Sequence, residues 1–65
     1  MTGQSRYAGL TANERLKVAG LKAEFDEAAH SRSRSEMIRI LGQVDVSHAA
    51  WLVDMIIANP RRHGY

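Results

Sequence analysis

The hydrophobic positions of this chain fall into three blocks, and each block repeats at the three- and four-residue intervals of an α-helix. The intervals predict three helices, at about residues 12–30, 34–43 and 48–58. No segment alternates apolar and polar residues for long enough to predict a strand. We therefore expect an all-α fold, a single domain of residues 1–65 built as a small three-helix bundle, with short N- and C-terminal tails at 1–10 and 61–65.

The first block has the clearest start signal. Thr11 is followed three residues later by Glu14, which is the spacing of a capping box. Beyond it, a main apolar stripe is expected to face the core and consists of Val18, Leu21, Phe25, Ala28 and Ala29. A weaker strip on the other side is expected to contact a second neighbour and consists of Leu16, Ala19 and Ala23.

The second block repeats the capping-box spacing with Ser33 and Glu36. Its apolar positions follow at helical intervals and are Met37, Ile40, Leu41 and Val44, with Ile38 beside them. The preceding segment SRSRS, residues 31–35, is either a phosphorylation target or a run of competing helix caps. We favour the caps, because serine is preferred at helix starts.

The third block, AAWLVDMIIA, is the most apolar segment of the chain and carries one charge, Asp54. Asp45 and Ser47 are both candidates for its N-cap. The helix should end before Pro60, because a proline disfavours helical geometry in the residue that precedes it. A helix that is apolar nearly all round is usually enclosed on several sides, so we expect this helix to be the hydrophobic centre of the domain.

The size of the chain limits what can enclose that helix. A chain of 65 residues buries only about 60% of the surface that its unfolded form exposes. Cysteine is absent, so no disulfide can add stability. The remaining sources are well-packed helices, tails that fold back through Tyr7 and Tyr65, or association with a second copy as a homodimer.

The sequence predicts a cytoplasmic protein that does not enter the membrane. Residues 1–10 lack the basic region, apolar run and small-residue cleavage site of a secretory signal. No apolar stretch approaches the roughly 20 residues that a membrane-spanning helix needs.

Binding to nucleic acid is the alternative function that the sequence leaves open. The net charge is only +2, and the third helix has no lysine or arginine to face a DNA groove. Phosphate contacts would have to come from scattered arginines, which are Arg32, Arg34, Arg39, Arg61 and Arg62. Ordinary solvated arginines explain the same residues, so we favour a protein partner or a second copy over nucleic acid.

No pattern of catalytic, cofactor-binding or metal-ligating residues emerges. His30, His48 and His63 are too scattered to define a metal site, and Asp26 with His30 supplies only two ligands. The glycines are dispersed and form no phosphate-binding loop. We therefore expect no enzymatic activity, no metal and no cofactor.

The sequence favours a non-catalytic protein-interaction or regulatory module. Aromatic residues and methionine are enriched in interface cores, and the candidates of this kind are Trp51, Met55, Ile57 and Tyr65. The same residues could instead form the core of a domain that has little else to bury. We assign Trp51 and Met55 to the interface, and we assign to the core Leu52, Val53 and Ile56.

Several segments together resemble a group of short uncharacterised proteobacterial proteins. The shared pattern is GLTxxERL…AAWxVDxIxANP…GY, and here it extends from Tyr7 to Tyr65 through YAGLTANERL, EFD, AAW, ANP and the final GY. The resemblance implies a small helical cytoplasmic protein. It implies no mechanism and no site residue.

Overall fold

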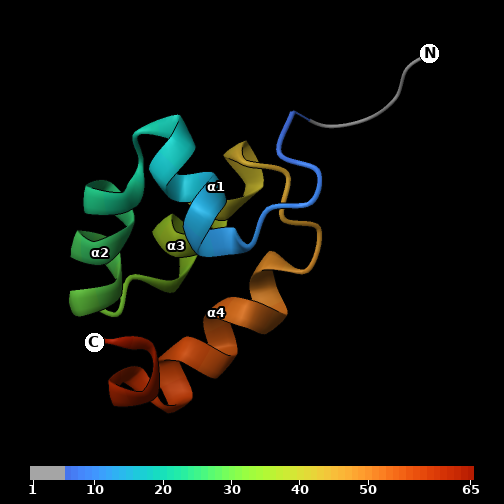
Figure 1. The fold of residues 1–65 in the computed structure, drawn as a ribbon. Coiled ribbons are helices and arrows are strands. Elements are labelled where there is room, and N and C mark those ends of the chain that lie inside the picture. The colour runs from blue at the N-terminus through green and yellow to red at the C-terminus, as the bar shows by residue number, and fades with distance from the viewer. Residues whose placement is uncertain (1–5) are drawn as a thin grey trace.

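The computed structural model describes residues 6–65, and no strand occurs in that range (Figure 1). It contains four α-helices and a final 3₁₀ helix: α1 (Ala12–Ala19), α2 (Lys22–His30), α3 (Arg34–Gln43), α4 (Ala49–Ala58) and η1 (Pro60–His63). The all-α prediction is confirmed. The predicted number of helices is wrong, because the first predicted helix is divided into α1 and α2.

The division occurs at Gly20, which closes α1. Gly20 has a φ angle of 75°, in the left-handed region where glycine meets no steric penalty. Its N–H donates to the carbonyl oxygens of Leu16 and Lys17, and the Leu21 N–H donates to the Leu16 carbonyl at 2.8 Å. These bonds form a Schellman motif. The apolar spacing hid the break because Leu21 continues the helical intervals across it.

The break changes which residues of the first block are buried. Val18 is 58% exposed, although its spacing predicted a core position, whereas Leu16 is only 2% exposed. Ala23, from the weaker predicted strip, is exposed. The α2 part of the main stripe is buried as predicted and comprises Phe25, Ala28 and Ala29. A stripe extends only along one helix axis, so the prediction fails where the axis changes.

The predicted caps are partly confirmed. At α1 the Thr11 hydroxyl accepts from the Glu14 N–H at 3.2 Å, and the Glu14 carboxylate accepts from the Thr11 N–H at 2.9 Å. Ser33 is the N-cap of α3, but its side chain makes no capping hydrogen bond. The second capping box is therefore wrong, and the Glu36 carboxylate accepts hydrogen bonds from Arg39 instead.

The N-cap predicted for α4 is also wrong. His48 occupies that position, and its side chain makes no capping hydrogen bond. Asp45 instead closes α3 with a φ angle of 64°, and the next N–H, from Val46, donates to the Leu41 carbonyl at 3.1 Å. Ser47 lies between these two ends and caps neither helix. Asp45 thus follows a helix end rather than starting the next helix.

α3 is the centre of the fold, because it packs against both α2 and α4. The side chains with the least exposure are Met37, Ile40, Leu41, Val44 and Val53. All but the last belong to α3 or to its C-terminal cap. The prediction that the most apolar helix forms the centre is therefore wrong. α4 buries one side only, through Ala49, Val53 and Ile56.

Both ends of the described chain pack against the helices. Tyr7 is buried, at 8% exposure. At the other end η1 is followed by Tyr65, whose N–H donates to the Pro60 carbonyl at 2.7 Å. The chain end returns toward α2 (Figure 1). Residues 61–65 are thus not a free tail, and residues 1–5 of the predicted N-terminal tail lie outside the described residues.

Arg15 joins the N-terminal segment to the end of α3. Its Nε donates to the Leu10 carbonyl at 2.9 Å, and its Nη1 donates to the carbonyls of Val44 at 3.1 Å and Asp45 at 2.9 Å. A helix end leaves carbonyl groups without intrahelical partners, and a guanidinium can satisfy several of them in one plane. No local sequence pattern distinguishes Arg15 from the other arginines.

Replacing Arg15 tests this connection. Arg15→Ala should lower the free energy of unfolding by about 1–2 kcal/mol, because three carbonyl groups lose a charged donor. Urea unfolding at neutral pH measures the change. Lys17→Ala, at an exposed position of the same helix, is the control and should leave the midpoint nearly unchanged. Equal midpoints for the two variants would contradict the role of Arg15.

The burial of α4 is tested by placing a charge at two apolar positions. Ile56→Asp should lower the free energy of unfolding by about 3 kcal/mol or more, because an unpaired carboxylate would enter the core. Val18→Asp, at an exposed apolar position, should retain the helicity and cooperative melt of the wild type. Circular dichroism during heating measures both. An unchanged melt for Ile56→Asp would overturn the core assignment.

Candidate functional site

The outer face of α4, defined here as Trp51, Met55 and Ala58, carries large apolar side chains in solvent. Trp51 is 61% exposed and Met55 is 41% exposed. They lie one helical turn apart and therefore adjoin on the same side of the helix. Tryptophan is among the residues most enriched at interface hot spots, so its exposure here marks this face as a candidate binding surface.

His48 supports the position of the indole ring. The ring centroids of His48 and Trp51 are 5.8 Å apart with an angle of 58° between their planes. A ring held by a neighbour loses less conformational freedom when a partner binds than a ring that moves freely. Trp51 is thus exposed and has the His48 ring as a neighbour.

A shallow pocket continues the outer face of α4 toward η1. It has a volume of about 340 Å³ and is lined by Met55, Ala58, Asn59, Arg62 and His63. Its apolar floor comes from the end of α4, and its polar rim comes from the cap residue and η1. An apolar side chain from another molecule would find both contact area and hydrogen-bond donors at this position.

Two of the four predicted interface residues do not lie on this face. Ile57 is partly buried and packs against the core. It lies six residues after Trp51, which is not a whole number of helical turns, so it points to another side of α4. Tyr65 is also partly buried, and it packs against α2. The structure thus brings together Trp51 and Met55 and separates them from the other two.

Tyr65 is held by a cluster of side chains on α2. Its Oη donates to Asp26 Oδ1 at 2.5 Å, and the same oxygen accepts from Lys22 Nζ at 2.6 Å. The ring makes edge contacts with Phe25, at a centroid distance of 6.3 Å, and with His30, at 5.3 Å. These contacts explain why the end of the chain lies beside α2.

The hydrogen bonds of this cluster change the ionisation of its members. Partial burial opposes the charge on Asp26, but hydrogen bonds from Lys22 and Tyr65 outweigh it, so the pKa of Asp26 falls below its ordinary value of 3.8. Burial and the bond to Asp26 raise the pKa of the Tyr65 phenol above its ordinary value of 10.0. At neutral pH the pair is therefore a carboxylate and a phenol.

Removal of the Tyr65 hydroxyl should lower stability in a pH-dependent way. Tyr65→Phe is expected to lower the free energy of unfolding by about 1 kcal/mol at neutral pH. Because the pKa of Asp26 is depressed in the folded chain, its stabilisation is present above its ordinary pKa of 3.8. That stabilisation is lost as the pH falls below 3.8 and through the folded-state pKa.

Urea unfolding at several pH values measures this difference. The gap between wild type and Tyr65→Phe should narrow as the pH falls below 3.8 and through the folded-state pKa of Asp26, because protonation of the carboxylate weakens the acceptor. Asp26→Asn is the control for the pH dependence, because the asparagine side chain has no carboxylate that could be protonated over this range. A gap that stays constant over this range would contradict the role of the carboxylate.

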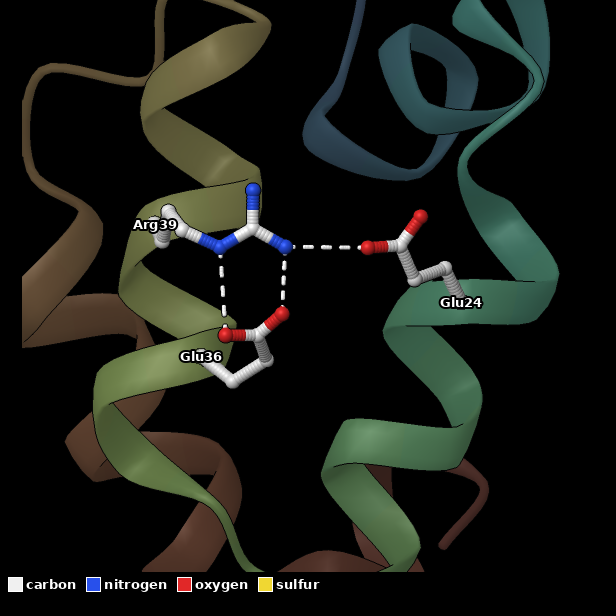
Figure 2. Close-up of polar contacts among 3 residues, drawn as sticks. All are labelled: Glu24, Glu36 and Arg39. Carbon is white, nitrogen blue, oxygen red and sulfur yellow. Dashed lines mark hydrogen bonds and ion pairs between the residues drawn. The ribbon is translucent and has the colours of Figure 1, made fainter.

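Two of the predicted phosphate-binding arginines are engaged by carboxylates. Arg34 donates to Asp54 through Nε at 2.7 Å and Nη2 at 3.3 Å, which joins α3 to α4. Arg39 donates through Nε to Glu36 at 3.1 Å and through Nη2 to Glu36 and, at 2.9 Å, to Glu24 on α2 (Figure 2). Both guanidinium groups therefore already have anionic partners.

These pairs shift the ionisation of the groups they join. The hydrogen bond from Arg34 lowers the pKa of Asp54, whose side chain is more than half exposed. The hydrogen bonds to Glu36 and Glu24 raise the pKa of Arg39. Exposed pairs of this kind contribute little to stability, so their main consequence is to satisfy the positive charges.

The other three arginines differ from these two. Arg32 has a left-handed φ angle of 56°, and its guanidinium donates to the Ala29 carbonyl at 2.6 Å. Arg61 and Arg62 are exposed on η1, and neither has an ion pair or hydrogen-bonded side chain within residues 6–65. Arg61 and Arg62 are thus the arginines best placed to meet an external anion.

The described part of the chain holds no cluster of three or more histidine, cysteine, aspartate or glutamate residues able to bind a metal ion. Asp26 and His30 are close through Tyr65, but the carboxylate is occupied by Lys22 and the tyrosine. His48 instead contacts Trp51. None of the helices within residues 6–65 combines the length and apolarity needed to cross a membrane.

Comparisons of the chain with protein-family models, with curated proteins and with solved structures gave no match. The resemblance of the sequence pattern to short proteobacterial proteins therefore stays a prediction.

Proposed function

We propose that the protein is a non-catalytic interaction module that binds another protein, or a second copy of itself, through the outer face of α4. The exposure of Trp51 is the observation that carries this proposal. The sequence-based expectation of a cytoplasmic location accompanies it as a prediction.

The contrast between the two sides of α4 supports the proposal. One side is buried through Val53 and Ile56, at 0% and 6% exposure, and the other carries Trp51 and Met55 in solvent. Exposed tryptophan and methionine on one face increase the apolar surface that water must cover, and a partner removes that surface from water. The adjoining pocket offers a place for an apolar anchor from the partner.

A second copy is the simplest partner that this geometry allows. Two α4 helices that pack antiparallel would use the same surface on both subunits, as a two-fold interface requires. Both tryptophans would then lie near the centre, where hot-spot residues gather. Such association would also add buried area to a domain of only 65 residues.

Light scattering over a hundredfold concentration range tests self-association. We expect a species of twice 7.3 kDa that dissociates on dilution. Trp51→Ala should abolish it, because the variant removes the largest exposed side chain of the face. Val18→Ala, which truncates an exposed apolar residue on α1, is the matched control and should associate like the wild type.

Two outcomes would change the proposal. A dimer that persists in Trp51→Ala would show that another surface forms the interface. A constant mass of 7.3 kDa would exclude the second copy and leave a different protein as the partner. Trp51 is the only tryptophan, so a blue shift of its emission on association reports directly on this face.

Nucleic-acid binding remains the alternative function. It is supported by Arg61 and Arg62, which are exposed and adjacent, while Arg34 and Arg39 are already paired with carboxylates. Binding through phosphate contacts would weaken steeply as salt rises. Association through the outer face of α4 would change little with salt, so a salt titration separates the two functions.

A further inference from the structure

A second pocket, distinct from the outer face of α4, opens into the core between α1, α4 and the end of the chain. Its volume is about 190 Å³. Its floor is made of side chains that are otherwise buried, namely Leu16, Phe25, Leu41 and Ile56. Trp51 and Met55 do not line it. It shares His63 with the shallow pocket beside the outer face of α4, but none of the three residues that define that face lines it.

The walls of this core pocket combine small, apolar and polar groups. Ala12 leaves space on the α1 side, and Leu52 lines the α4 side. Asn13 and His63 supply polar atoms at the mouth, and neither side chain has a hydrogen-bond partner within residues 6–65. Tyr65, fixed by Asp26, forms part of the wall.

The size and lining of the core pocket define what it can hold. An apolar cavity of about 150 Å³ in a protein core is large enough for benzene. The core pocket is somewhat larger, its floor is apolar, and its free polar groups are at the mouth. We propose that it binds a small single-ring aromatic compound that carries one hydroxyl or N–H group, with the ring on the floor and the polar group at Asn13 and His63.

Two separate interactions hold the aromatic compound in the core pocket. Burial of the ring against Leu16, Phe25 and Ile56 removes the apolar surface of the ligand from water. The polar substituent exchanges hydrogen bonds to water for bonds to the Asn13 amide or the His63 imidazole, which leaves no buried polar group unpaired. A compound without that substituent would use only the first interaction.

Titration of ¹⁵N-labelled protein with phenol, followed by amide chemical shifts, tests the proposal. Saturable shifts are expected at millimolar phenol and should centre on the residues that line the core pocket. Ala12→Leu fills the pocket and should weaken binding at least tenfold. Ala50→Leu, which adds the same side chain at an exposed position of α4, is the control and should bind like the wild type.

Toluene isolates the contribution of the polar rim. Asn13→Ala should weaken phenol several-fold and leave toluene unchanged, because toluene makes no hydrogen bond. If circular dichroism shows that Ala12→Leu has lost its helicity, Leu52→Phe fills the opposite wall in its place. Shifts that do not saturate, or full phenol affinity in a folded filling variant, would overturn the proposal.

Discussion

The complete burial of α3 is the constraint on which the rest of the structure depends. Met37, Ile40 and Leu41 are all at 0% exposure, and helices on two sides are needed to cover them. Among residues 6–65, α2 and α4 serve that purpose, α1 packs against α2, and η1 contacts α4 but leaves Trp51 exposed. The exposed position of Trp51 follows from this shortage of covering elements rather than from a polar face on α4.

The starts and ends of helices were predictable where a local sequence signal determines the backbone conformation. Thr11 with Glu14 began α1 as expected, and Pro60 ended α4. Gly20 is a signal for the end of a helix, but the apolar spacing continues past it, so the break between α1 and α2 was not predicted. Arg32 and Asp45 close α2 and α3 in the same left-handed conformation, yet neither is glycine. Each is followed by an N–H that donates back to a helix carbonyl, from Ser33 to Ala28 and from Val46 to Leu41, and the apolar spacing does not predict these closing bonds.

The candidate site was predictable only in part. Exposure of Trp51 and Met55 could be inferred because α4 has more apolar positions than one core can cover. Tyr65 resembled them in composition, but its ring is held by Asp26 and Phe25, almost forty residues earlier in the chain. The core pocket also joins residues from distant segments, such as Ala12 and His63. Which residues meet in such a pocket depends on the tertiary structure, so no local pattern in the sequence predicts them.

The order of the helix contacts has a consequence for folding kinetics. Each helix packs mainly against its neighbour in sequence, and such local contacts are typical of fast-folding domains. The polar links between distant segments are few, and they include Arg15 with Asp45 and Asp26 with Tyr65. The apolar interior can form before these two links close the long loops between the residues that they join. Interactions that form after the transition state mainly slow unfolding, so we expect both links to prolong the lifetime of the folded state rather than speed its formation.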